Sequence, residues 1–301
     1  MTSSFRIALP ATSANLGPAF DAAGLALDLY LELTAQPSAE SSIAAQGRDA
    51  EICGRVEDHL ILKTYRAALD RAGAPPRPLA LTIDNAIPIG KGCGSSAAAR
   101  LAGLALANRF GNLGWSNERI IEEGTRLEGH PDNIAACWLG GLVISRGGEG
   151  NTVQTLRLTP ALNWPLLLAI PAAALATEAA RAVLPAEYQR ADAVKNIQNA
   201  MLLLAAFAQG RGELLRFAFE DRMHEPYRAQ LCPLLPALKP LAGSEGILGV
   251  ALSGAGPSVL LVLEATAKAD AVRRRVADRL ASQGLEAELL PTRAAAGVRL
   301  G

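Results

Sequence analysis

Pro88-Ile-Gly-Lys-Gly-Cys-Gly-Ser-Ser-Ala-Ala-Ala99 is the stretch of this chain that decides its fold and what it can bind. The stretch contains three glycines at alternate positions and then two hydroxyl side chains, namely Gly90, Gly92, Gly94, Ser95 and Ser96. An alternating apolar segment before it predicts a strand at residues 79–84, and the small residues after it predict a helix over 95–110.

A glycine-rich loop that opens onto a helix start is typical of a phosphate site. Glycines let the backbone approach a ligand closely, and the first N–H groups of the helix lack partners and favour negative charge. Ser95 or Ser96 can cap the helix or offer its hydroxyl to a phosphate or a metal ion. A lone Gly-x-Gly more often marks a plain tight turn, but three glycines and two serines together favour the phosphate site.

The loop belongs to neither of the two commonest nucleotide motifs. No Gly-Lys-Ser/Thr triplet closes it, which excludes a Walker A loop. The Gly-x-Gly-x-Gly spacing, with no clear strand ending in an acid after the helix, argues against a dinucleotide fingerprint.

The pattern Pro-x-x-x-Gly-x-Gly-Ser-Ser-Ala at residues 88–97 resembles the ATP-phosphate loop of the GHMP kinases. Cys93 stands where that family usually has Leu, so we expect sensitivity to thiol reagents that ATP protects against. Ser253-Gly-Ala-Gly-Pro257 would by itself be a hairpin turn, but it resembles the third GHMP motif, which packs against the phosphate loop. The resemblance implies ATP contacts from Pro88, Ile89, Gly90, Lys91, Gly92, Cys93, Gly94, Ser95, Ser96, Ala97, Ser253, Gly254, Ala255 and Gly256.

Four further segments resemble one branch of that family, the homoserine kinases. They are Pro-Ala-Thr-Ser-Ala-Asn-Leu-Gly-x-x-Phe-Asp at 10–21, Glu-Gly-His-x-Asp-Asn at 128–133, Thr-x-x-Ala-Arg-x-x-Leu-Pro at 177–185 and His-Glu-Pro-x-Arg at 224–228. Taken singly, the first is a polar β-turn loop after a strand at 5–9, the second a helix cap, and the third a surface helix with Thr177 as its N-cap.

The resemblance implies a role for each matching residue. Substrate contacts would come from Asn15, Asp21, His130, Asn133, Thr177, Arg181 and Arg228. Arg228 would pair with a carboxylate, which its planar fork suits, and Asp21, Arg181 and Ser96 would be catalytic. Asp21 would either take the hydroxyl proton or only orient the substrate.

The resemblance also implies a Mg²⁺ ion held by Ser96 and Glu128. Glu122 and Glu123 are nearby alternatives, but on a helix we expect them to form a solvated face. His59 precedes a predicted helix and is expected to be a surface histidine, outside the site.

Composition narrows the class of protein. The 29 basic and 29 acidic residues balance, which argues against nucleic-acid binding. No run of about 20 apolar residues predicts a membrane span, and the first residues lack the apolar core of a signal peptide. The four cysteines are isolated, with no metal-like spacing, which predicts a reduced, cytoplasmic protein.

The fold class implied by the resemblance is α+β, the GHMP-kinase fold. It has an N-terminal domain, here residues 1–160, with a left-handed βαβ unit (ribosomal protein S5 domain 2-like). A ferredoxin-like C-terminal domain follows at 161–301, and a homodimer is a family-based expectation. The implied substrates are ATP and L-homoserine. Two alternatives are a GHMP kinase for another small alcohol, which the His130 and Arg228 segments disfavour, and a regulator without catalysis, which intact Asp21, Ser96 and Glu128 disfavour.

Overall fold

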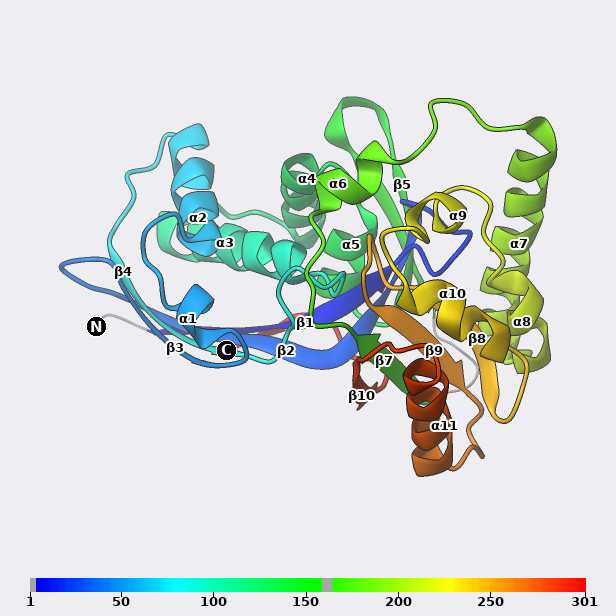
Figure 1. Cartoon of the computed structure of the whole chain (residues 1–301). Coiled ribbons are helices and arrows are strands. Elements are labelled where there is room, and N and C mark those ends of the chain that lie inside the picture. Colours follow the sequence, from blue (N-terminus) through cyan, green and yellow to red (C-terminus); the bar gives the residue numbers. More distant parts are fainter. Residues whose placement is uncertain (1–3, 159–163) are drawn as a thin grey trace.

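The computed structural model describes residues 4–158 and 164–301, and their strands form two sheets (Figure 1). The larger sheet is built on the antiparallel pair β1 and β2 in the order β11-β1-β2-β4-β3, and β5 and β6 extend it from the start of β2. Its strands are β1 (Phe5–Ala14), β2 (Ala23–Pro37), β3 (Ser42–Gly47), β4 (Leu79–Asn85), β5 (Leu142–Gly147), β6 (Val153–Leu158) and β11 (Arg299–Leu300). β3 and β4 run parallel, so their connection forms the βαβ unit that the resemblance implies.

β1 is longer than the sequence predicted. The strand was expected to end at residue 9, but residues 11–14 pair with residues 24–27 and are buried. The register shifts between Pro10 and Ala11, since proline has no N–H to donate and is accommodated at a bulge. The predicted loop start at Pro10 is therefore wrong, and the turn begins only at Asn15.

Five helices of the first half cover one face of the larger sheet (Figure 1). They are α1 (Ala50–Cys53), α2 (Leu60–Arg71), α3 (Ser95–Gly111), α4 (Asn117–Glu128) and α5 (Asp132–Leu139). The small residues of α3 allow close packing, because a Cβ added to Gly103 would lie 2.6 Å from the Ile61 carbonyl oxygen on α2. Ser116 caps α4 as predicted, accepting from the backbone N–H of Arg119.

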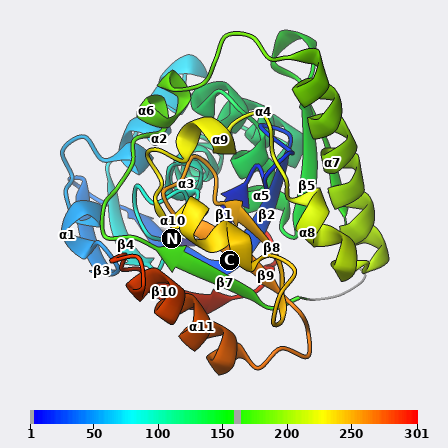
Figure 2. The same cartoon turned by 45° about the vertical axis from the view of Figure 1, so that its right-hand side comes forward.

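The second sheet is antiparallel, in the order β10-β7-β9-β8, and has the β-α-β-β-α-β succession of a ferredoxin-like unit (Figure 2). Its strands are β7 (Leu166–Ile170), β8 (Ile247–Leu252), β9 (Val259–Leu263) and β10 (Glu288–Thr292). The helices of this half are α6 (Thr177–Ala182), α7 (Arg190–Gln209), α8 (Leu215–Ala218), α9 (Glu225–Arg228), α10 (Leu234–Leu238) and α11 (Ala269–Ala281), with 3₁₀ turns at Glu149–Asn151, Gly212–Leu214 and Lys239–Leu241.

The second sheet is buried on both faces. Alternate residues of a strand face opposite sides, so Leu166 and Leu168 join the core shared with the first half, while Leu167 and Ala169 face α10 and α11. The two halves therefore share one large core, and a site between them rests on packed elements on both sides.

The chain does not divide cleanly into two pieces. The proposed boundary at residues 160 and 161 lies outside the described residues, so this division remains a proposal. After β10 the chain returns to the larger sheet, where β11 pairs with β1. Among the helices described, none combines the length and apolar character needed to cross a bilayer.

Candidate functional site

A cavity of about 500 Å³ lies where the two halves meet, and nearly all the predicted site residues line it. The first half contributes the loop at 15–21, the phosphate loop and the segment 128–133. The second half contributes Thr177, Arg181, Arg228 and the loop at 254–256. Four residues of the predicted ATP set are not among the lining residues, namely Pro88, Lys91, Ala97 and Ser253.

The phosphate loop has the backbone that its glycines predict. Gly90, Gly92 and Gly94 have φ of 70°, 75° and 71°, a region that side chains disfavour. A Cβ on Gly92 would overlap the Ser253 carbonyl oxygen, so the two loops touch through bare backbone. The Ser253 hydroxyl also donates to the Gly92 carbonyl oxygen at 2.9 Å. The predicted packing of the third motif against this loop is confirmed.

Four side chains of the phosphate loop behave differently from the prediction. The N-cap of α3 is Gly94, so Ser95 and Ser96 are helical residues with no capping bond. Lys91 donates to the Ala172 carbonyl oxygen, away from the phosphate site. Cys93 is 1 % exposed, and burial raises the pKa of its thiol to about 12. The expected sensitivity to thiol reagents is therefore wrong, because a buried, un-ionised thiol is a poor nucleophile.

Ser96 and Glu128 meet at one edge of the cavity, as the resemblance implied. The Ser96 hydroxyl donates to Glu128 Oε2 at 3.0 Å, and Arg100 Nε donates to the same oxygen at 2.7 Å. The alternative metal ligands lie elsewhere. Glu123 is buried between Arg119 and Arg126, so the solvated face expected for it is wrong.

Asp21 and Arg181 face each other across the two halves. Arg181 donates to both oxygens of the Asp21 carboxylate, at 2.6 and 3.1 Å. The carboxylate is held in place by its own loop, since Asn15 Oδ1 accepts from the Asp21 backbone N–H at 3.0 Å. Asn15 Nδ2 donates to the Gly254 carbonyl oxygen, which ties this loop to the other half.

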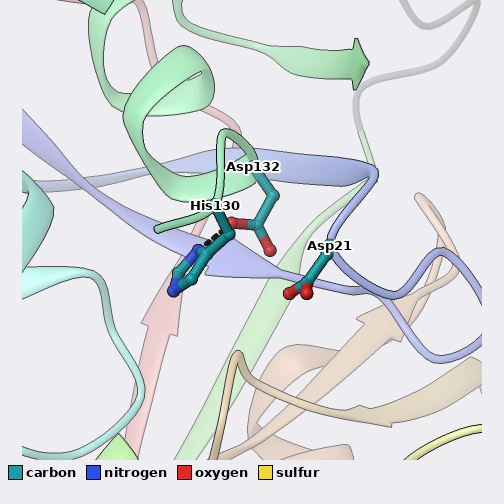
Figure 3. Close-up of side chains that lie close together, drawn as sticks. All are labelled: Asp21, His130 and Asp132. Carbon is teal, nitrogen blue, oxygen red and sulfur yellow. Dashed lines mark hydrogen bonds and ion pairs between the residues drawn. The ribbon is translucent and has the colours of Figure 1, made fainter. Parts of the chain in front are cut away.

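Asp132 lies in the Glu-Gly-His-x-Asp-Asn segment, but the sequence predicted no role for it. Its buried carboxylate accepts from the Asn133 backbone N–H at 2.8 Å and contacts His130 Nδ1 at 2.6 Å (Figure 3). Burial lowers the pKa of His130, but the Asp132 carboxylate has the larger combined effect. The pKa of His130 is therefore raised above its usual value. The sequence feature that could have indicated this role is an acidic residue directly before Asn133, a predicted substrate contact.

The three side chains in Figure 3 form a polar cluster. Ligand atoms of Asp21, His130 and Asp132 lie within 4.8 Å of one another. Asp21 is already paired with Arg181, and Asp132 contacts His130, so both carboxylates of the cluster have partners within the protein.

Arg228 is a buried cation at the cavity wall, with 1 % of the residue exposed. Among the described residues, its acceptors are all neutral, namely the carbonyl oxygens of Ala180 and Gly254 and Nδ1 of His224. Burial and the nearby Arg181 lower the pKa of Arg228. None of the ion pairs of the described residues includes Arg228, so its charge lacks a carboxylate partner. Such a charge calls for an anionic ligand.

The structure differs from two predictions, on the cap of α6 and on the position of His59. Thr177 lines the cavity as the first residue of α6, but the N-cap is Ala176 and no side chain caps the helix. His59, expected at the surface, also lines the cavity, beside Ile52, Ile61 and Ile83. Burial lowers the pKa of His59, and a backbone contact with Cys53 acts in the opposite direction.

Comparison with known proteins identifies the family of this chain. The family model described as GHMP kinases N terminal domain matches residues 59–141, and GHMP kinases C terminal matches residues 203–282. A homoserine kinase of Solibacter usitatus is 47% identical over 262 residues, 86% of this chain and 85% of that protein. A homoserine kinase of Carboxydothermus hydrogenoformans is 39% identical over 288 residues, 95% of this chain and 93% of that protein.

Solved structures of similar proteins share the fold. A homoserine kinase from Cytophaga hutchinsonii has a TM-score of 0.83 at 23% identity, covering 100% of this chain and 98% of that one. A putative homoserine kinase from Listeria monocytogenes has a TM-score of 0.74 at 30% identity, with 99% of each chain covered. With both family models matched, and relatives of this identity aligned over most of its length, the chain belongs to the GHMP kinases, in the homoserine kinase family.

Proposed function

We propose that this protein transfers the γ-phosphoryl group of ATP to the side-chain hydroxyl of L-homoserine, giving ADP and O-phospho-L-homoserine, a step toward threonine. The observation that carries the proposal is the pairing of opposite charges in one cavity. Arg228 offers a buried cation without a carboxylate partner, and the carboxylates of Asp21 and Asp132 line the same cavity. An amino acid carries both matching charges, and the phosphate loop lines the same cavity.

The ATP molecule would lie along the glycine loop. The loop amides and the start of α3 face the cavity and suit its phosphates. Beyond them, Ile52, Ile61 and Ile83 form an apolar end with His59, which suits a flat base.

A Mg²⁺ ion fits the oxygen donors of Ser96 and Glu128. These two side chains already touch, and hydroxyl and carboxylate oxygens are the ligands that Mg²⁺ prefers. When bound, such an ion supplies charge neutralisation for the phosphates of ATP. Arg100, which pairs with the same Glu128 oxygen, would keep this carboxylate oriented.

The amino acid would be held by groups from both halves. Arg228 would take its carboxylate, and Asn15, Asp21, His130 and Asn133 would take the amino and hydroxyl ends, with Thr177 and Arg181 beside the acceptor hydroxyl. Phosphoryl transfer depends mainly on in-line positioning and on neutralising charge. Arg181 would stabilise the transferring group, and its pairing with Asp21 keeps it at the cavity.

The test is ADP release with Mg-ATP and a panel of L-homoserine, mevalonate, galactose, L-serine and L-threonine. We expect release with L-homoserine alone. Release with another alcohol would keep the phosphate site and discard the proposed pocket. Bound ATP without any release would favour a regulatory protein instead.

Arg228→Ala sharpens this test. Because a paired charge would be lost, the KM for L-homoserine should rise about 30-fold or more, with little change in the KM for ATP. Arg279→Ala is the matched control, since Arg279 also donates to a carbonyl oxygen but lies on α11, outside the cavity lining. A KM effect confined to ATP would contradict the assignment of Arg228.

The cellular setting is also a proposal. All four cysteines are free and buried, which supports a reducing compartment, the cytoplasm. The substrates proposed are small molecules, with no nucleic acid or membrane involved, and a homodimer remains the family-based expectation.

A further inference from the structure

The side chain of His224 connects the buried Arg228 to the loop that carries Asn15 and Asp21. His224 is the residue before α9 and has no exposed surface. One ring nitrogen, Nε2, lies 2.8 Å from the Gly17 carbonyl oxygen, and the other, Nδ1, lies 3.1 Å from Arg228 Nη1. The two nitrogens therefore contact the two halves of the chain, Gly17 in the first and Arg228 in the second.

These contacts define the tautomer of the ring. A carbonyl oxygen can only accept, so Nε2 carries the hydrogen and donates to Gly17. A guanidinium can only donate, so Nδ1 carries the lone pair and accepts from Arg228. Burial lowers the pKa of His224, which agrees with a neutral ring.

Two carboxylates near the ring, those of Asp221 and Glu225, already accept hydrogen bonds from other groups. Asp221 Oδ2 lies 3.8 Å from Nε2, too far for a hydrogen bond, and accepts from the backbone N–H groups of His224 and Glu225. Glu225 accepts from the Leu252 N–H and pairs with Lys239. Gly17 and Arg228 are therefore the hydrogen-bond partners of the two ring nitrogens.

The guanidinium of Arg228 is held on two sides and left open on the third. Its Nε donates to the Ala180 carbonyl oxygen, and Nη1 contacts His224 and the Gly254 carbonyl oxygen. Among the described residues, Nη2 has no acceptor and is left for a ligand. Phe20 completes the packing, with its ring 5.1 Å from the imidazole and 5.3 Å from the guanidinium carbon.

We propose that His224 is a positioning residue that orients Arg228 toward the substrate carboxylate and ties that orientation to the loop binding the amino end. The inference rests on the proposed function, because it gives Arg228 the carboxylate of an amino acid. It predicts that His224 affects recognition of the carboxylate and has no direct part in the transfer of phosphate.

Two substitutions separate the two ring nitrogens. His224→Asn leaves an amide oxygen near the place of Nδ1, where it can accept from Arg228. His224→Gln leaves an amide N–H near the place of Nε2, where it can donate to Gly17 but offers Arg228 nothing. Both remove the ring and keep an amide; they differ by one methylene group and in which contact survives.

The readout is the ratio of kcat/KM for L-homoserine to kcat/KM for 3-aminopropan-1-ol, the same molecule without its carboxylate. Where the amino alcohol turns over too slowly, its competitive inhibition constant replaces its kcat/KM. We expect His224→Gln to lower the ratio about tenfold and His224→Asn to keep it within about threefold of the wild type. The KM for ATP should stay unchanged in both variants.

Either of two results would overturn the proposal: an unchanged ratio in His224→Gln, or equal losses in the two variants. A purely structural role would lower activity on both substrates together and leave the ratio constant.

If neither variant folds, the wild-type protein still provides a test. The chain has three histidines, so ¹⁵N-labelled imidazoles can be assigned with His59 and His130 variants. A neutral ring protonated on Nε2 supports the proposal, and an imidazolium or an Nδ1-protonated ring refutes it. No turnover of L-homoserine by the wild type would refute the proposed function, while this tautomer measurement would still report on His224 separately.

Discussion

Asp21 is held by a charged partner at its carboxylate and by a neutral partner at its backbone. Arg181 holds both of its oxygens, and the backbone N–H of Asp21 is held by Asn15. Its backbone is left-handed, with φ of 54°. This geometry suits either removal of the hydroxyl proton or orientation of the acceptor. An asparagine at this position could still orient the acceptor but could not take the proton.

Asp21→Asn keeps the shape and removes the charge. If Asp21 takes the proton, kcat should fall about 100-fold or more, because general-base catalysis contributes that much. Single-turnover kinetics with L-homoserine would measure it. Asp28→Asn is the control, since Asp28 also pairs with an arginine, Arg293, but outside the cavity lining. An unchanged kcat would exclude the base and leave only positioning.

Cys93 shows how burial decides the chemistry of a side chain. In the native protein we expect no labelling of Cys93 by a thiol reagent at pH 8, with or without ATP, since its pKa is raised to about 12. After denaturation all four free cysteines should react. Rapid native labelling that ATP slows would contradict the buried position.

At the scale of elements, the position of α5 on β2 places three cavity residues at once. The start of α5 carries Asp132 and Asn133, and His130 precedes it. The helix lies so close to β2 that a Cβ on Gly24 would overlap the Asp132 carbonyl oxygen and lie 2.9 Å from the Ala136 side chain. Gly24 therefore sets the depth at which these groups reach the cavity.

Gly24→Ala should displace α5 and with it the substrate groups. Overpacking of this kind costs about 1–3 kcal/mol, so the melting temperature should fall. We also expect kcat/KM for L-homoserine to fall about tenfold, while the KM for ATP changes little. Gly147→Ala, at the end of β5 with open space around it, is the control. Equal activity of the two variants would show that α5 tolerates the shift.

At the scale of the whole molecule, both core clusters contain buried thiols, Cys93 in one and Cys232 in the other. Burial raises the pKa of Cys93 to about 12 and of Cys232 to about 11, from an ordinary value of 9.0. Unfolded thiols ionise near pH 9, but the folded ones keep their protons to higher pH. The stabilisation is therefore fully present below pH 9 and is lost as the pH rises toward 11 and 12.

The free energy of unfolding should accordingly fall between pH 9 and pH 11. Each such thiol can change the unfolding constant by up to about tenfold per pH unit in that window. Urea unfolding at pH 8, 9 and 10 would measure the slope, and Cys93→Ala should flatten it. The same slope in that variant would mean that Cys93 ionises in the folded protein.

The sequence by itself determined the phosphate loop, the family and most of the cavity lining, because these depend on local patterns. Three alternate glycines at 90–94 impose a backbone that any fold must accommodate, and the prediction was correct there. Ser116 could be recognised as an N-cap for the same reason.

Only the tertiary structure decided which side chains are buried and which charges lack a partner. Sequence patterns cannot show that Glu123 is enclosed by two arginines, that His59 lines the cavity, or that Asp132 holds His130. The pairing of His224 with Arg228 spans one helical turn, but its second contact reaches Gly17, some 200 residues away in sequence. Burial and long-range pairing arise when distant segments pack together, so the charge and orientation of these groups are properties of the folded chain.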